Sequence, residues 1–143
     1  MKTCKIGSVK IQNNICLAPM AGLTDIAFRV LAKKQGVGLV WTEMVSVNAI
    51  NQNNRITMDM TKIDPTERPI AIQLFGQQVD EIERAVKKIE DRADIIDFNM
   101  GCPATHILRA GSCSALLGRP EKAKKIIEII RKSTKKPITN RPP

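Results

Sequence analysis

The stretch IIDFNMGCPA, residues 95–104, combines an apolar run typical of a buried β-strand with an abrupt turn. Residues 95–98 are rich in side chains that favour strands, and Gly101 and Pro103 flank a cysteine where the run ends. Because Pro103 stiffens the backbone, we expect Cys102 to lie at the end of the strand rather than inside it. The stretch therefore predicts a strand that carries a thiol to its carboxyl end.

Further apolar runs of the same kind recur along the chain. They span residues 15–18, 39–42, 70–75 and 137–139. Amphipathic patterns typical of helices lie between them, in residues 24–36, 79–90 and 120–132. Strands that alternate with helices at this spacing predict an α/β fold built on a parallel sheet.

The helical patterns carry their own start and stop signals. Thr24 is the N-cap expected for the first helix, Ala27, Val30 and Leu31 form its apolar face, and Gly36 ends it. The two later helices each place four apolar residues on one face: Val79, Ile82, Val86 and Ile89 in one, and Ala123, Ile126, Ile127 and Ile130 after Pro120 in the other. Residues 46–59 are less periodic and predict a short helix followed by a loop.

Residues suited to chemistry follow directly after the predicted strands. PMAG (residues 19–22) follows the first strand, Glu43 the second, Gln73 and Gly76 lie at the third, and Asn99 precedes the GCP turn. Right-handed crossovers place the carboxyl ends of parallel strands on one side, so these residues should form one rim. A (β/α)8 barrel builds its active site there, whereas a doubly wound sheet more often carries a G-x-G-x-x-G turn, which this sequence lacks.

The length of the chain limits how much of a barrel it can form. A complete (β/α)8 barrel takes about 250 residues, and the 143 residues here hold about four βα units and the start of a fifth strand. We expect residues 1–143 to be one truncated domain, the N-terminal half of such a barrel. Two open sheet edges would then invite self-association, and Pro142 and Pro143 would limit the fifth strand because proline cannot donate to the ladder.

Composition narrows the class of protein. The chain is 43% apolar, and its polar N-terminus and the lack of about 18 consecutive apolar residues argue against a signal peptide or a membrane span. We therefore expect a cytoplasmic protein whose four separated cysteines are free thiols. The net charge of +9 is uneven, since residues 84–143 carry 14 Lys and Arg against 6 Asp and Glu. Such a surplus suits either a polyanion partner or the solvated face of an ordinary helix.

Five motifs resemble those of one enzyme family, in the order and at the strand ends expected. They are LAPMAGLTDIAFR (17–29), TEMVS (42–46), IQLFG (72–76), DFNMGCPA (97–104) and GSCSALL (111–117). Over residues 11–139 the chain resembles the tRNA-dihydrouridine synthases, which are flavin enzymes on a TIM barrel. The resemblance implies that FMN lies at the barrel mouth and that NADPH reduces it. A uridine flipped out of tRNA then receives a hydride at C6 and a proton at C5.

The resemblance also assigns roles to individual residues. It makes Cys102 the catalytic proton donor, which suits a thiol because its ordinary pKa of about 8.5 keeps it protonated near neutrality. It implies that Pro19, Met20, Ala21 and Gln73 bind FMN, that Arg141 replaces a flavin-binding lysine, and that Asn99 and His106 contact the substrate. Glu43 is expected to brace a loop by hydrogen bonding.

The sequence departs from the family at three places. His106 stands where many members have lysine, so a permanent charge is lost. Cys113 stands where many have glycine, which adds bulk to a loop near the ligand. The later barrel strands, their phosphate-binding loops and the family's C-terminal helical domain for tRNA have no counterpart in residues 1–143.

Three other functions fit parts of the sequence. One is another FMN barrel that acts on a free pyrimidine, such as dihydroorotate dehydrogenase, which also presents a strand-end Asn and Pro near its flavin. The chain also fits an inactive remnant that self-associates through its open edges and binds RNA electrostatically. Cys102, His106 and Cys113 are zinc-ligand types, but their spacing matches no familiar zinc motif and a fourth ligand is missing, so we predict no metal site.

Overall fold

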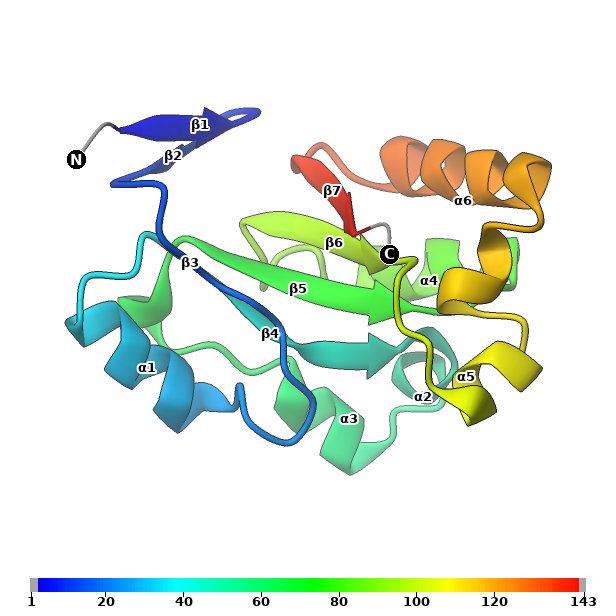
Figure 1. The fold of residues 1–143 in the computed structure, drawn as a ribbon, viewed down its shortest axis with the longest axis horizontal. Coiled ribbons are helices and arrows are strands. Elements are labelled where there is room, and N and C mark those ends of the chain that lie inside the picture. The colour runs from blue at the N-terminus through cyan, green and yellow to red at the C-terminus, as the bar shows by residue number, and fades with distance from the viewer. Residues whose placement is uncertain (1–2, 142–143) are drawn as a thin grey trace.

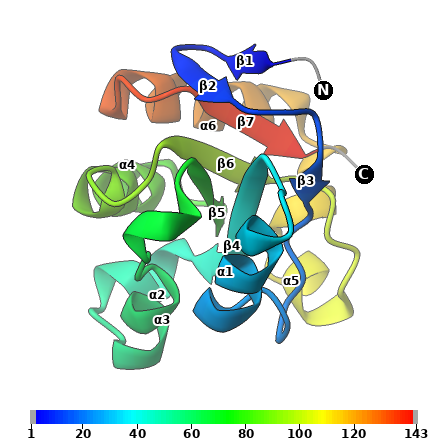
Figure 2. The same ribbon diagram turned by 90° about the vertical axis from the view of Figure 1, so that its left-hand side faces the viewer.

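A curved parallel sheet organises the molecule, whose computed structural model describes residues 3–141. Its five strands lie side by side in chain order: β3 (Cys16–Leu17), β4 (Leu39–Ser46), β5 (Ile70–Phe75), β6 (Ile95–Asn99) and β7 (Ile138–Arg141). Figure 2 shows the strands curving as an arc. This order and curvature are those of a partial (β/α)8 barrel, so the predicted α/β fold is confirmed. Pro142 and Pro143, which we expected to limit the last strand, lie outside the described residues.

Helices cover the convex side of the arc (Figures 1 and 2). The long ones are α1 (Ile26–Lys34), α4 (Val79–Ile89) and α6 (Pro120–Ser133), and the shorter elements are α2 (Val47–Asn51), α3 (Arg55–Met60), α5 (Thr105–Arg109) and the 3₁₀ turns η1 (Pro65–Glu67) and η2 (Cys113–Leu116). None of the helices within residues 3–141 has both the length and the apolar character that crossing a membrane requires.

The main core lies between the sheet and these helices. Ile72, Leu74, Ile96 and Phe98 face outward from β5 and β6 and are fully buried against apolar residues of α4 and α6. Those residues include Ile82, Val86 and Ile89 of α4 and Ile126 and Ile130 of α6, as the periodicity predicted. Burying one such side chain contributes about 1.5–3 kcal/mol, so the two crossover helices hold the sheet's curvature.

An N-terminal hairpin closes one end of the sheet and was not predicted. Strands β1 (Cys4–Ile6) and β2 (Val9–Ile11) pair antiparallel around a turn in which Gly7 has a φ of 56°. Ile11 packs with Leu39, Ala71 and Ile95, which lie at or near the starts of β4, β5 and β6. The hairpin therefore covers the amino ends of the strands, opposite to the rim where the chemical residues were expected.

Three predictions about the helices were wrong in detail. Asp25, not Thr24, caps α1 and accepts a hydrogen bond from the Phe28 amide, because the Thr24 hydroxyl is bonded to Met20 instead. Leu31, predicted to face the core, is 56% exposed. Residues 46–59 form two short helices, α2 and α3, rather than one helix and a loop.

The concave side of the sheet carries a row of four paired residues, three of them polar. Met44, Gln73, Asp97 and Thr139 are paired across β4, β5, β6 and β7, so their side chains share one face. Gln73 and Asp97 are only 1% and 3% exposed. Buried polar groups of this kind need partners, and the candidate site is built on them.

Candidate active site

A pocket of about 370 Å³ opens at the carboxyl ends of the strands. It brings together six of the eight site residues expected from the sequence: Pro19, Ala21, Gln73, Asn99, Cys102 and Arg141. Met44, Gly101 and Pro103 complete the lining. These residues come from the ends of β4 to β7 and from the loops that follow β3 and β6, which is where barrel enzymes place their catalytic groups.

A chain of hydrogen bonds runs through the wall of this pocket. The Thr139 hydroxyl donates to Asp97 Oδ1 at 2.5 Å, and Gln73 Nε2 donates to Asp97 Oδ2 at the same distance. Asn99 Nδ2 then donates to Gln73 Oε1 at 3.0 Å. Finally, Asn99 Oδ1 accepts from the backbone N–H groups of Gly101 and Cys102, at 3.0 and 2.9 Å. The buried network thus connects β7 to the cysteine turn.

The Cys102 turn is held from a second direction by the loop that follows α5. The Cys102 carbonyl accepts a hydrogen bond from the Ser114 hydroxyl at 2.9 Å and faces the Ser114 amide at 3.5 Å. Cys102 itself is half-buried and lines the pocket. Its thiol is therefore positioned by backbone contacts on both sides of the residue and remains open to a ligand.

Cys113 lies beside this turn, and its thiol is expected to be unreactive. It is fully buried, and burial is the main cause that raises the pKa of its thiol to about 12, with neighbouring Cys102 adding to the rise. Its backbone φ of 53° lies in the left-handed region that favours glycine. Cys113 therefore occupies a conformation that suits glycine, the residue the resemblance led us to expect there.

The loop after β3, which carries Pro19 to Ala21, is held by four hydrogen bonds. The Thr24 hydroxyl bonds the Met20 amide at 3.1 Å, and the Met20 carbonyl accepts from the Leu23 and Thr24 amides. The Gly22 amide donates to a carboxylate oxygen of Glu43. Glu43 thus braces this loop, as the sequence analysis expected, and it does not line the pocket.

An irregularity in β4 makes that brace possible. The register between β4 and β5 shifts between Trp41 and Met44. The Thr42 hydroxyl accepts a hydrogen bond from the backbone N–H of Gln73 at 3.1 Å within this bulge. Bulges commonly redirect side chains beside active sites. Here Met44 lines the pocket while Glu43 reaches the loop after β3.

Two residues expected at the site do not line the pocket. Met20 contributes backbone hydrogen bonds to the turn, and its side chain is not part of the lining. His106 lies exposed on the short helix α5. Within residues 3–141 no three His, Cys, Asp or Glu side chains are close enough to hold a metal ion, so Cys102, His106 and Cys113 form no such group.

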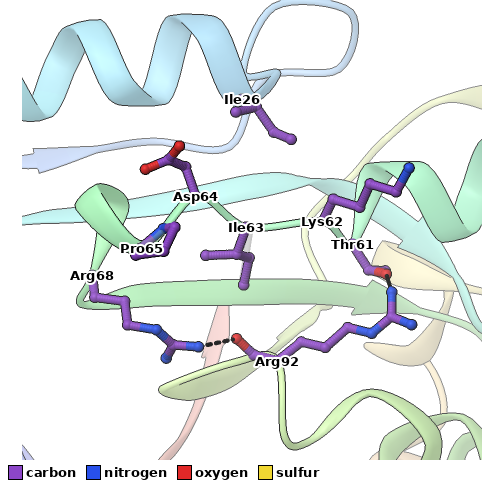
Figure 3. Close-up of a pocket in the computed structure, with 8 residues that line it drawn as sticks. All are labelled: Ile26, Thr61, Lys62, Ile63, Asp64, Pro65, Arg68 and Arg92. Carbon is purple, nitrogen blue, oxygen red and sulfur yellow. Dashed lines mark hydrogen bonds between the residues drawn. The ribbon is translucent and has the colours of Figure 1, made fainter.

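A wider hollow, of about 610 Å³, lies at the other end of the sheet (Figure 3). It is bounded by Ile26, residues 61–65, Arg68 and Arg92. Its arginines are engaged within the protein: Arg92 donates to the Thr61 hydroxyl at 2.6 Å, and Arg68 donates to the Arg92 carbonyl and pairs with Asp94. The end of a barrel opposite its active site usually serves stability, and these contacts fit that role.

Four residues that shape the site were not singled out from the sequence: Thr42, Asp97, Ser114 and Thr139. A signal was present for one of them. In the strand IIDFN, Asp97 and Asn99 are two residues apart and must share a face, so a carboxylate had to lie beside the amide already singled out. The contacts of the other three join distant segments and left no local pattern.

Comparison with known proteins agrees with this geometry. Residues 16–141 match the dihydrouridine synthase (Dus) family. A probable tRNA-dihydrouridine synthase of Rickettsia prowazekii is 40% identical over 139 residues, which cover 94% of this chain and 42% of that protein. The tRNA-dihydrouridine synthase B of Pasteurella multocida is 38% identical over 136 residues, covering 94% and 41%. A probable tRNA-dihydrouridine synthase 1 of Synechocystis is 35% identical over 140 residues, covering 96% and 39%.

The fold and the strand-end pocket define a partial (β/α)8 barrel of the kind that binds ligands at its mouth. The chain belongs to the dihydrouridine synthase family, because the match covers nearly all of its residues. It spans about two fifths of the length of the curated relatives it matches.

Proposed function

We propose that this chain forms the cofactor-binding and proton-donating part of a tRNA-dihydrouridine synthase. The reaction is the reduction of uridine in tRNA to 5,6-dihydrouridine, with FMN as cofactor and NADPH as reductant. The observation that carries the proposal is the position of Cys102 in the wall of a pocket that also contains Gln73, Asn99 and Arg141. The names of the relatives support tRNA as the substrate.

The groups around the pocket suit FMN. Pro19 and Ala21 offer a small, backbone-rich surface on which a planar ring can lie. Gln73 offers amide hydrogen bonds to the ring's polar edge, and Arg141 offers a cation for carbonyl oxygens or phosphate. Met20 acts through its backbone, which holds this loop in place. FMN, when bound and reduced, supplies the hydride that a pyrimidine C6 accepts.

Cys102 supplies the proton. Reduction of a pyrimidine double bond places negative charge at C5 and its carbonyl, so an acid is needed on that side. The Cys102 thiol is half-buried, lines the pocket and is held by Asn99 and Ser114 through its backbone. Asn99 also lines the pocket and can orient the uracil, and His106 lies exposed on α5, where it can meet the RNA.

The basic residues of α6 provide a surface for tRNA. Lys124, Lys125, Arg131 and Lys132 are exposed on this helix. Phosphate contacts from such residues give affinity that does not depend on sequence. We place the reaction in the cytoplasm, where tRNA and NADPH meet.

The ends of the sheet offer a route to self-association. β3 and β7 are its edge strands, each paired on one side among the described residues. An uncovered strand edge is a template for another chain. We propose that copies of this chain pair through these edges, which gel filtration would show as a dimer or larger species.

The proposal is tested by FMN binding and by tRNA reduction on the same preparation. We expect the chain to bind FMN stoichiometrically, seen in its visible spectrum, and the formation of dihydrouridine in unmodified tRNA is then assayed with NADPH present. Cys102→Ala should keep FMN binding and lose turnover. If Cys102→Ala loses both FMN binding and turnover, Cys102 has a structural role. If the wild-type chain binds no FMN, the proposal fails. Reduction of free orotate instead of tRNA would favour a dehydrogenase of free pyrimidines.

A further inference from the structure

Asp97 is a buried carboxylate on the concave side of the sheet. It is 3% exposed, and no Lys or Arg within residues 3–141 forms an ion pair with it. Its two oxygens instead accept hydrogen bonds from the Thr139 hydroxyl and from Gln73 Nε2, both at 2.5 Å. An ionised carboxylate accepts and cannot donate, so both neighbours must present hydrogens to it.

This requirement passes along the network. With its Nε2 on Asp97, Gln73 turns its Oε1 to Asn99 Nδ2 at 3.0 Å. Asn99 therefore turns its Oδ1 to the backbone N–H groups of Gly101 and Cys102. Those N–H groups can only donate, so Asn99 must turn its oxygen toward them and its nitrogen toward Gln73. The carboxylate of Asp97 requires the same direction of donation from the other end of the network. The orientation of both amides follows from the chemistry at the two ends.

The remaining hydrogens of the two amides define what the pocket offers. Each amide nitrogen carries two hydrogens and uses one of them within the network. Gln73 and Asn99 both line the pocket, and Arg141 adds further donors beside them. The polar groups of this wall are therefore mainly donors, and a matching ligand edge must carry acceptors.

We propose that Asp97 sets the hydrogen-bond polarity of the pocket, so that Gln73 and Asn99 present N–H groups and select a planar ligand edge rich in carbonyl oxygens or ring nitrogens. The same network makes Asp97 a positioning residue for Cys102, because it ends on the Cys102 backbone. Identification of that ligand as FMN or uracil rests on the proposed function. The polarity itself does not.

Two isosteric exchanges test the proposal, since they should have opposite results. In Asp97→Asn the new amide can still turn its oxygen to Gln73 and its nitrogen to the Thr139 hydroxyl, so the polarity survives. In Asn99→Asp a carboxylate oxygen faces Gln73 Oε1, and two acceptors then meet. Asp97→Leu removes the acceptor altogether, and Asp91→Leu, at an exposed site, is the matched control.

The first measurement needs no ligand. Each variant of the full chain is treated with iodoacetamide, and modification of Cys102 is followed by peptide mass spectrometry with the exposed Cys16 as internal reference. We expect the ratio of the Cys102 rate to the Cys16 rate to rise about tenfold in Asp97→Leu and Asn99→Asp, where the network that anchors the turn is broken at Gln73. It should stay within about twofold of wild type in Asp97→Asn and Asp91→Leu.

The second measurement is FMN titration of the same variants. The Kd should rise about tenfold or more in Asp97→Leu and Asn99→Asp, and Asp97→Asn should stay near wild type. If Asp97→Leu does not fold, Asn99→Asp carries the test. Equal damage in Asp97→Asn and Asp97→Leu, or none in Asn99→Asp, would overturn the proposal. If wild type binds no FMN while the Cys102 rates follow the expected order, the polarity holds and the proposed function fails.

Discussion

Arg29 and Glu67 form a buried ion pair that joins α1 to η1, with 2.5 Å between Nε and Oε2. Arg29 also donates to the carbonyl oxygens of Thr24 and Lys62, at 2.7 and 3.1 Å. Glu67 accepts a further hydrogen bond from the Asp64 amide at 2.7 Å. The pair therefore ties the loop that precedes α1 to the segment that precedes β5, and each charge is fully satisfied.

Glu67→Gln should be strongly destabilising. The new amide nitrogen must face either Arg29 or the Asp64 amide, both of which donate, and the arginine charge stays buried without its partner. We expect the free energy of unfolding to fall by about 3–5 kcal/mol, measured by urea denaturation. Glu83→Gln, which breaks the exposed pair with Lys87 on α4, is the control and should cost about 1 kcal/mol or less. Equal losses in the two variants would contradict this account.

The backbone at Cys113 should prefer glycine. Its φ of 53° costs a residue with a Cβ about 1–2 kcal/mol, so Cys113→Gly should be more stable than Cys113→Ala by about 1 kcal/mol. Chemical denaturation of both variants measures the difference. Ala115→Gly, in the same turn but without a positive φ, should instead destabilise the protein. If Cys113→Ala were more stable than Cys113→Gly, the backbone at this position would not be strained.

The Cys113 thiol should make stability depend on alkaline pH. Its folded pKa of about 12 lies above the ordinary value, so the folded state holds the proton more tightly than the unfolded state. This contribution to stability is complete below about pH 8.5, the unfolded pKa, and is lost as the pH rises toward 12. Wild type should lose up to about 1.4 kcal/mol per pH unit more than Cys113→Ala within that window. Unfolding curves at pH 8 and pH 10.5 would show no such difference if the thiol titrates normally.

The basic face of α6 should account for part of the affinity for tRNA. Lys124→Glu and Lys125→Glu remove exposed cations, so both should weaken binding and make the dependence of log K on log salt less steep, by about one unit per lost phosphate contact. Lys10→Glu, on the exposed side of the hairpin, is a charge-matched control. Filter binding across a salt series measures the affinity of each variant. If all three variants behave alike, α6 does not contribute specifically to tRNA binding.

The sequence predicted the repeating parts of the molecule better than its particular contacts. The apolar run at Ile70–Phe75 became β5 with those bounds, and the periodic faces of α4 and α6 are buried as expected. These features depend on local pattern, which a single sequence displays. The hairpin was missed because its strands are only three residues each, too short for an alternating pattern to stand out, although Gly7 marked its turn.

The site shows the same limit. Cys102, Gln73 and Asn99 could be found because motifs at strand ends name them, and the structure places them in one pocket. The contact of Thr139 with Asp97 joins residues 42 positions apart, and no local pattern reveals such a pair. Thr24 was mistaken for a helix cap because its hydroxyl serves the turn at Met20 instead, a choice that only the folded loop decides.

The hairpin at the amino ends of the strands shields apolar surface from solvent. Leu39, Ala71 and Ile95 are fully buried and pack against Ile11 of the hairpin. Without the hairpin these side chains would meet water, and exposed apolar patches promote association between chains. The hairpin therefore acts as a cap that protects this end of the sheet from aggregation.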